Sequence, residues 1–186
     1  GGGERGQGGA RGGGVWATAR PRDRKDENGW GRGQLMSGRR EESGMVRGEM
    51  GGTIAEGAVR GGMLNPVRRI SSLPADGTAD PSCAEIAMGA DGRFVYASNR
   101  GHNSIAGFSV DAKTGKLTSI GQFMTGAIPR SFNLDPDNQW MIAAGQRSHD
   151  LHVYKRDSTS GKLKRIYQQP TGQGPSWVQF IPKESK

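Results

Sequence analysis

Side chains that move protons or bind anions lie between short apolar segments in the second half of the chain. They include Glu85, Arg100, His102 and Arg130. Carboxylate and imidazole groups act as general acids and bases, whereas guanidinium binds carboxylates and phosphates through paired hydrogen bonds. These residue types predict acid–base or anion-binding chemistry, provided that the fold brings them together.

Metal and thiol chemistry have less support in the sequence. His149 and His152 are three residues apart, a spacing that suits a metal only on a helix, and the residues around them are typical of a strand. Cys83 is the single cysteine and has no histidine close to it in sequence, so we expect a small buried side chain rather than a catalytic thiol. No phosphate-binding loop, serine nucleophile turn or zinc pattern occurs. We therefore expect no metal and no cofactor.

The first third of the chain differs in composition from the rest. Residues 1–62 hold 20 of the 32 glycines and very few aliphatic residues, with no run long enough for a strand or an amphipathic helix. Such a segment cannot bury enough apolar surface to offset the entropy lost on ordering. We expect residues 1–62 to be a disordered Gly/Arg-rich leader, and residues 63–186 to form the folded part.

The same segment bears on localisation and partners. No apolar run before Ile70 could serve as a secretory signal, and no run could span a membrane. A single cysteine agrees with a reducing compartment, so we expect a cytoplasmic protein without a membrane partner. Two isolated Arg-Gly-Gly units, at residues 11–13 and 60–62, resemble pieces of RNA-binding segments. Residues 1–62 carry 11 basic and 8 acidic residues, a net charge of only +3. Because nucleic acid binding depends on a large excess of positive charge, we do not expect a nucleic acid partner.

The second half of the chain contains an internal repeat with an offset of 46 residues. The matching segments are 91–98 with 137–144, 104–108 with 150–154, and 115–117 with 161–163. Each unit has four short β-branched and aromatic segments between turn residues, which in the first unit are approximately residues 84–88, 93–99, 103–110 and 116–123. Four strands in a repeated unit of this length predict the blade of a β-propeller.

Blade geometry then places the loops at two ends. In four antiparallel strands, the loop between the second and third strands lies at the same end as the connection to the next blade. This end receives the loops with Arg100, His102, Arg130 and Gln146, and Glu85 begins an innermost strand near it. The candidate side chains should therefore converge near the propeller axis, where such folds commonly bind ligands.

The repeated unit resembles a known family. Residues 84–86 and 91–105 are similar to the signature of the seven-bladed lactonase family of the 6-phosphogluconolactonase type. Residues 129–132 and 177–182 resemble the last blades and the C-terminal strand of that family, and residues 67–74 resemble the outer strand of the preceding blade. The resemblance implies an all-β fold: a partial β-propeller of about two to three four-stranded blades after the disordered leader.

The resemblance also implies an activity, the hydrolysis of a sugar lactone, typically 6-phosphogluconolactone of the pentose phosphate pathway, to the open acid. At the matching positions, Arg100 and Arg130 would bind anionic groups of the substrate, and Glu85 or His102 would transfer or position protons. Gln146 takes the place of Arg100 in the next repeat and could donate a neutral hydrogen bond. Glu85, Arg100 and His102 are thus candidate catalytic residues, and Arg130 and Gln146 candidate substrate-binding residues. Arg100 could instead pair with Glu85 or cap a neighbouring strand.

The length of the chain limits this expectation. Seven blades of this size need roughly 320 residues, and residues 63–186 supply 124. We therefore expect open blade faces that favour self-association, and a lactone hydrolase only where a full propeller forms. The alternative is a non-catalytic propeller fragment that serves as a binding or interaction module. Saturable hydrolysis that Arg100→Ala abolishes would distinguish the two.

Overall fold

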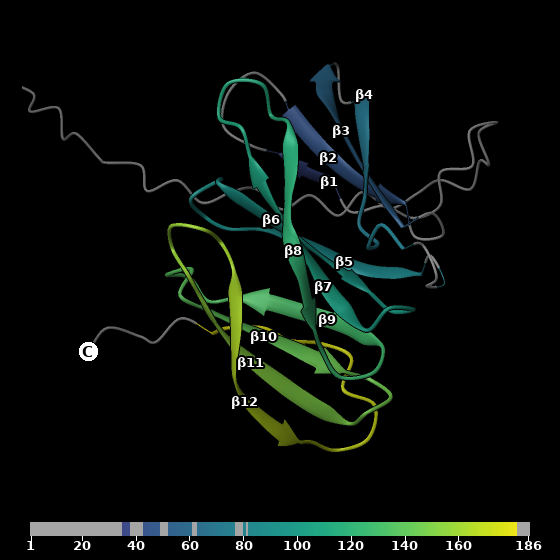
Figure 1. Cartoon of the computed structure of the whole chain (residues 1–186), viewed down its shortest axis with the longest axis vertical. Helices are drawn as coiled ribbons and strands as arrows, with labels where there is room; N and C mark the ends of the chain where they lie inside the picture. Colours follow the sequence, from purple (N-terminus) through teal and green to yellow (C-terminus); the bar gives the residue numbers. More distant parts are fainter. Residues whose placement is uncertain are drawn as a thin grey trace, which may run out of the picture.

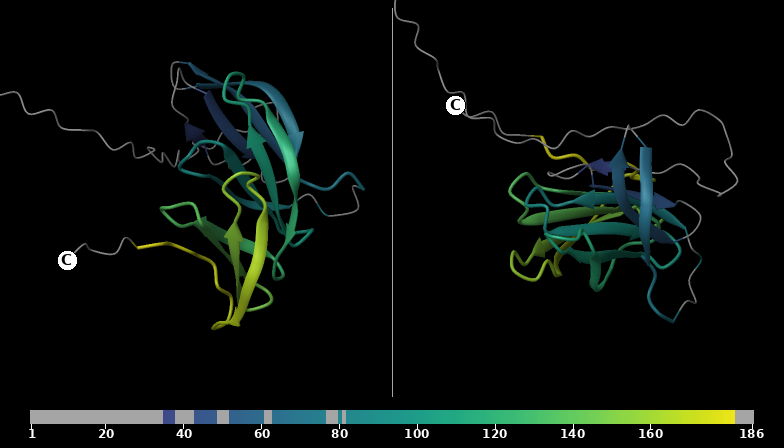
Figure 2. Two further views of the ribbon diagram at one scale, coloured as in Figure 1. Left: turned by 60° about the vertical axis from the view of Figure 1, so that its left-hand side comes forward. Right: turned by 90° about the horizontal axis from the view of Figure 1, so that it is seen from above.

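The computed structural model describes residues 35–37, 43–48, 52–60, 63–76, 80 and 82–181. These residues form twelve strands in three four-stranded antiparallel sheets, and no helix among them is long and apolar enough to cross a membrane. Figures 1 and 2 show the sheets following one another along the long axis of the molecule. We call the sheets blades 1, 2 and 3 in chain order.

Each blade is a meander in which consecutive strands are neighbours. Blade 1 contains β1 (Leu35–Ser37), β2 (Ser43–Gly48), β3 (Thr53–Arg60) and β4 (Met63–Ser71). Blade 2 contains β5 (Cys83–Met88), β6 (Phe94–Asn99), β7 (Ser104–Val110) and β8 (Leu117–Met124). Blade 3 contains β9 (Pro129–Leu134), β10 (Trp140–Gly145), β11 (Asp150–Arg156) and β12 (Leu163–Pro170).

The predicted all-β partial propeller is confirmed. The four strands of blade 2 match the predicted segments to within one residue at each end. The backbone repeats as the sequence does, because positive φ angles recur 46 residues apart, at Gly92 (67°) and Asn138 (57°) and again at Gly115 and Gly161 (both 69°). These turns need the left-handed region, which Gly and Asn adopt more readily than other residues.

The expected boundary at residue 62 is wrong for the part of the leader that the structure describes. Residues 35–37, 43–48 and 53–60 form β1, β2 and β3, and β3 pairs with β4 across the expected boundary. Met45 and Ile54 are buried against blade 2, so tertiary packing offsets the low strand propensity of the glycines around them. Most of the expected leader, including residues 1–34, lies outside the described residues.

The blades pack face to face through two apolar clusters. All six residues of β6 are buried, because its alternate side chains point to opposite neighbours. Val95 and Ala97 join the cluster between blades 1 and 2, which consists of Met45, Ile54, Ile86, Val95, Ala97, Ala106, Phe108 and Leu117. Phe94 and Tyr96 join the cluster between blades 2 and 3, which consists of Ala87, Phe94, Tyr96, Ile105, Phe132, Leu134, Met141, Ala143, Tyr154 and Leu163.

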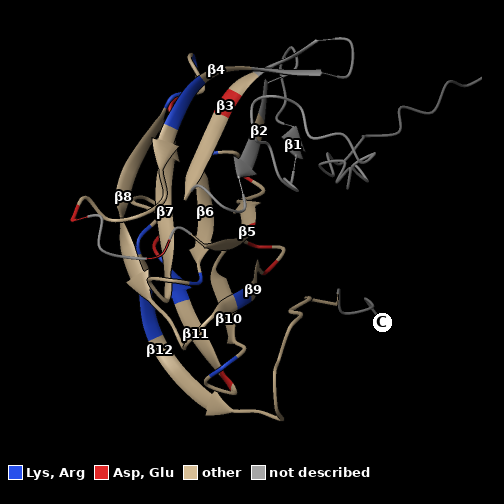
Figure 3. Ribbon diagram, turned by 90° about the vertical axis from the view of Figure 1, so that its right-hand side faces the viewer, with Lys and Arg blue, Asp and Glu red and all other residues tan. Residues whose placement is uncertain are grey.

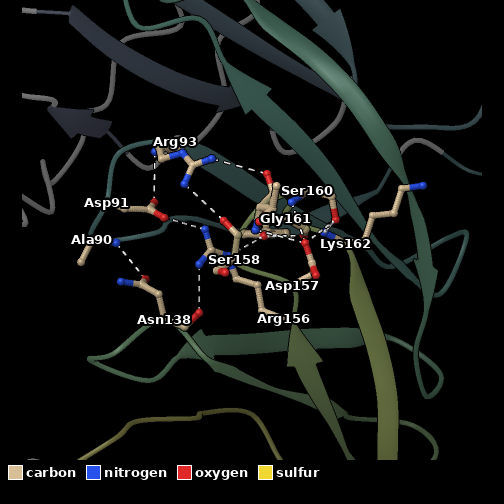
Figure 4. A network of polar contacts seen from close by, with 12 residues as sticks. Ala90, Asp91, Arg93, Asn138, Arg156, Asp157, Ser158, Ser160, Gly161 and Lys162 are labelled. Carbon is tan, nitrogen blue, oxygen red and sulfur yellow. Dashed lines mark hydrogen bonds and ion pairs between the residues drawn. The ribbon is translucent and has the colours of Figure 1, made fainter.

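A polar network joins blades 2 and 3 at the end with the β5–β6 turn (Figure 4). The buried guanidinium of Arg156 donates to Asp91 Oδ2 (2.8 Å), to the Tyr96 hydroxyl (3.0 Å) and to the backbone carbonyl of Asn138 (2.9 Å). Burial opposes ionisation of Asp91, but the hydrogen bonds and charge of Arg156 outweigh it and hold the pKa of Asp91 below its ordinary value. The network therefore fixes the angle between the two blades with ionic as well as apolar contacts.

The segment after β12 was expected to be a strand and has no strand ladder in the structure. It lies beside β9, where the backbone N–H of Val178 donates to Ser131 Oγ (3.1 Å) and Asn133 Nδ2 donates to the Val178 carbonyl (3.4 Å). These bonds use side chains of β9, so main-chain pairing does not form between the two segments. Residues 177–181 are extended along blade 3 without becoming part of its sheet.

Candidate functional site

A pocket of about 230 Å³ lies at the end of the blades where β5 and β9 begin. Its lining residues are Ala84, Glu85, Arg100, Arg130, Ser131, Ser176 and Trp177. Two guanidinium groups, one carboxylate, two hydroxyls and an indole thus surround one space. The predicted convergence of Glu85, Arg100 and Arg130 is what the structure shows.

The lining residues follow the repeat. Ala84 and Glu85 in β5 are followed 46 residues later by Arg130 and Ser131 in β9, and after a further 46 by Ser176 and Trp177. We call these three sets the pocket pairs. Because equivalent positions of successive blades lie around a common axis, one position repeated along the chain converges on one place in space. Arg100 is the single lining residue from another part of the unit, the loop after β6.

Glu85 is held by the strands around it. Its backbone N–H donates to Ser98 Oγ in β6 (2.9 Å), and its Oε2 accepts the backbone N–H of Phe132 in β9 (2.8 Å). The side chain is half-buried. One carboxylate oxygen therefore joins blades 2 and 3 while the residue lines the pocket.

The two arginines come from different kinds of segment. Arg100 is half-buried, and its backbone N–H donates to the carbonyl of Ser82 (2.6 Å). Gly101 after it packs so closely on the backbone of Asp80 that a Cβ would overlap it, so a side chain is excluded there. Arg130 is exposed in β9, and basic residues also occur on the outer strands β4 and β12 (Figure 3). The pocket is thus rigid on the Arg100 side and open to solvent at Arg130.

His102 and Gln146 do not line the pocket. His102 Nδ1 is 2.8 Å from Ser104 Oγ, and Ser104 Oγ donates in turn to Gln122 Oε1 (2.9 Å). Since a hydroxyl has one proton to donate, Ser104 accepts the proton of His102 Nδ1. The backbone N–H of Gln146 donates to the carbonyl of Ile128 (3.0 Å), which repeats the Arg100–Ser82 bond 46 residues later. Gln146 therefore occupies the expected position in the repeat, but outside this pocket.

Within the described ranges, no group of three or more His, Cys, Asp or Glu side chains could hold a metal. His149 is exposed, whereas His152 is buried with Nε2 3.1 Å from Asp150 Oδ2. Cys83 is fully buried beside Ser72, as predicted for a structural cysteine. That the site works without a metal or cofactor stays a prediction.

A family model described as "Lactonase, 7-bladed beta-propeller" matches residues 44–180. The chain belongs to this lactonase family. The match begins within β2, so blade 1 is part of the lactonase propeller.

Relatives support the assignment. A 6-phosphogluconolactonase of Serratia proteamaculans is 34% identical over 137 residues, which are 73% of this chain and 41% of the relative. The structure of a periplasmic gluconolactonase from Pseudomonas aeruginosa matches with a TM-score of 0.75 at 26% identity, over 81% of this chain and 43% of that one. The structure of a protein from Lactobacillus plantarum matches with a TM-score of 0.72 at 35% identity, over 76% of this chain and 42% of that one. The chain spans about two-fifths of the length of each of these three proteins.

Four lining residues of this pocket were not among the predicted site residues: Ala84, Ser131, Ser176 and Trp177. Each is related to a predicted residue or to its neighbour by the 46-residue offset, since Glu85 leads to Ser131 and Arg130 leads to Ser176. Applying the offset to Glu85 and Arg130 would have found both serines. A second step of the offset, from Ser131, leads to Trp177, whose segment lies beside β9 in the structure.

Proposed function

We propose that the pocket binds an anionic sugar lactone of the 6-phosphogluconolactone type and that the protein hydrolyses it to the open acid. The observation that carries the proposal is that Glu85, Arg100 and Arg130 line one pocket at the same end of consecutive blades. Two fixed positive charges favour an anionic ligand, and guanidinium binds phosphate and carboxylate oxygens with two parallel hydrogen bonds. The names of the relatives agree with this substrate class.

Lactone hydrolysis places specific demands on the site. Water adds to the lactone carbonyl as a base takes its proton, and the tetrahedral oxyanion then expels the ring oxygen, which takes up this proton from the base as the C–O bond breaks. A carboxylate supplies the base, and a guanidinium stabilises the oxyanion. We assign the first role to Glu85 and the second to Arg100, which is the less exposed of the two arginines. The exposed Arg130 then binds the distal anionic group of the substrate.

The repeat supports a chemical role for the charge of Glu85. At the equivalent position of blade 3, Ser131 Oγ accepts the N–H of Val178 just as Glu85 Oε2 accepts the N–H of Phe132. A neutral hydroxyl is therefore sufficient for this contact between strands. Glu85 brings in addition a negative charge, which in the proposed reaction makes its carboxylate the base.

The remaining lining groups suit a sugar. The hydroxyls of Ser131 and Ser176 can exchange hydrogen bonds with substrate hydroxyls, and an indole such as that of Trp177 offers an apolar face to a sugar ring. His102, two residues after Arg100, would hold the loop through Ser104 rather than touch the substrate. Since one structural relative is periplasmic, the cytoplasmic location stays a prediction.

The test separates binding from turnover. Titration calorimetry with 6-phosphogluconate, the stable product, measures binding, and hydrolysis of the lactone is followed above its spontaneous rate. Arg100→Ala and Arg130→Ala should each weaken binding at least about tenfold, since a hydrogen bond to a charged group contributes about 1.5–3 kcal/mol. Arg147→Ala is the control, because Arg147 is exposed at the same end and does not line the pocket. If the protein binds 6-phosphogluconate but does not hydrolyse the lactone, the proposed hydrolysis is wrong and the protein is a binding module. If it does not bind 6-phosphogluconate, the whole proposal is wrong.

A further inference from the structure

Two of the three pocket pairs are preceded by the same side-chain hydrogen bond. Asn103 Oδ1 accepts the backbone N–H of Ile128 (2.8 Å), and His149 Nδ1 accepts the backbone N–H of Gly174 (3.0 Å). Both partners are related by the 46-residue offset, and all four residues have positive φ angles between 54° and 65°. We call these two bonds the clasps of the pocket.

Each clasp lies directly before a pocket pair. Ile128 is two residues before Arg130, and Gly174 is two residues before Ser176. A hydrogen bond at this point fixes where the chain turns inward from the outer strand of one blade toward the axis. The His149 clasp therefore holds the chain two residues before Ser176, and the bond from Val178 to Ser131 holds it just after Trp177.

The two clasps differ in chemistry. An amide oxygen accepts a hydrogen bond at any pH, so the Asn103 clasp is constant. An imidazole nitrogen accepts only when it carries no proton, and Gly174 presents an N–H that can only donate. Histidine is the side chain whose charge ordinarily changes between pH 5 and 8. His149 is exposed, so it exchanges protons with solvent without any opening of the fold.

We propose that His149 is a pH-sensitive positioning residue of the pocket. Neutral His149 accepts the hydrogen bond from Gly174 and so holds Ser176 and Trp177 in position at the pocket. Protonated His149 cannot accept this bond, so Ser176 and Trp177 are held less firmly. The consequence for ligand affinity rests on the proposed function, but the state of the clasp does not.

The surroundings of His149 keep the change local. The backbone carbonyl of His149 accepts the N–H of Thr171 (2.8 Å), a bond that protonation of the ring leaves in place. The segment 170–176 packed against His149 contains no charged or titratable side chain. On its own loop the charged neighbours are the exposed Arg147 and the buried Asp150, whose carboxylate is bonded to Ser148, His152 and Gln168.

The direct test is amide hydrogen exchange of the whole chain by NMR at pH 7.5 and 5.5, expressed as protection relative to the intrinsic rate. Protection of the Gly174 amide should fall several-fold at the lower pH, because a protonated Nδ1 cannot accept its hydrogen bond. The Ile128 amide, held by Asn103, is the internal control and should not change. Equal protection of Gly174 at both pH values would overturn the proposal.

A matched variant tests the assignment to His149. His149→Asn copies the Asn103 clasp, and Asn tolerates the positive φ of this position better than other side chains do. Gly174 should then be protected at both pH values. If the wild type loses protection at pH 5.5 and the variant loses it equally, another group is responsible and the proposal is wrong.

Ligand binding separates this inference from the proposed function. The affinity for 6-phosphogluconate should fall several-fold more between pH 7.5 and 5.5 in the wild type than in His149→Asn, a comparison that cancels the titration of the phosphate itself. An equal decrease in affinity in the two proteins would show that the His149 clasp does not position Ser176 and Trp177. If neither protein binds at either pH, the proposed function fails, while the exchange of Gly174 still decides whether the clasp is pH-sensitive.

Discussion

The carboxylate of Glu85 accepts the backbone N–H of Phe132 at 2.8 Å, and this bond links the innermost strands of two consecutive blades. The same link recurs 46 residues later between Ser131 Oγ and the N–H of Val178 at 3.1 Å. Glu85 therefore combines a structural bond, for which a neutral oxygen is sufficient, with a charge in the pocket. Substitutions can separate the two roles.

Glu85→Gln keeps an oxygen acceptor and removes the charge, so we expect stability to change by no more than about 0.5 kcal/mol. Hydrolysis of the lactone should fall by about 10²- to 10⁴-fold, the usual contribution of a general base. Glu85→Ala should lose both hydrolysis and about 1–3 kcal/mol of stability, because the N–H of Phe132 loses its acceptor. Urea unfolding and initial rates measure the two effects. Full hydrolysis by Glu85→Gln would exclude Glu85 as the base.

Removing the guanidinium of Arg156 should loosen blade 3 from blade 2 (Figure 4). Arg156→Met keeps an apolar stem over the Phe94 ring but loses the bonds to Asp91, Tyr96 and the carbonyl of Asn138. We expect a loss of about 2 kcal/mol, less than for a fully buried ion pair, because the side chain of Asp91 is 29% exposed. Lys164→Met, on the exposed face of β12, is the control and should stay within about 0.5 kcal/mol. Equal urea midpoints for the two variants would contradict a structural role of the network.

Asp150 should make blade 3 sensitive to acid. Burial opposes its ionisation, but hydrogen bonds from Ser148, His152 and Gln168 outweigh that cost and lower the pKa of Asp150 below its ordinary value. A carboxyl whose pKa is lower in the folded chain stabilises the fold above its unfolded pKa. This contribution disappears as the pH falls through the folded value.

Asp150→Asn should therefore cost about 1–3 kcal/mol at pH 7, because an amide nitrogen cannot accept the bonds that Asp150 accepts. The difference from wild type should shrink below about pH 4 as the native carboxyl takes up its proton. Thermal unfolding between pH 2.5 and 7 measures it, with the exposed Asp137→Asn as the control. A difference that stays constant down to pH 2.5 would show that the charge of Asp150 is not what stabilises the fold.

Gly126 should tolerate no side chain. A Cβ at this buried position between β8 and β9 would overlap Asp150 Oδ1 and Ser148 Oγ, which are bonded to each other at 2.5 Å. Because Asp150 is also bonded to His152 and Gln168, it cannot move aside without losing these bonds, so Gly126→Ala should cost about 2 kcal/mol or more. Gly172→Ala is the matched control, because no atom lies within 4 Å of its Cβ position. Similar thermal midpoints for the two variants would mean that the network around Asp150 rearranges easily.

The repeat made much of this fold predictable. The 46-residue offset and the β-branched and aromatic segments between turns located the strands of blade 2 to within one residue, because turn positions with positive φ, such as Gly92 and Gly115, favour Gly or Asn. The same offset implied that Glu85, Arg100 and Arg130 face one end of the sheets. The local sequence pattern was sufficient to predict strands and turns wherever the backbone conformation restricts the residue type.

The local sequence pattern could not predict the contacts between blades. The strands of blade 1 lie in a Gly-rich part of the sequence, and Met45 and Ile54 become core residues because blade 2 covers them. His102 and Gln146 belong to the predicted loops, yet neither lines the pocket, and His102 is bonded to Ser104 instead. Residue types and spacing determined the repeat, the strands and the end at which polar groups gather. Which of those groups share the pocket depended on packing between residues 46 positions apart, because side-chain direction is set by neighbours in space.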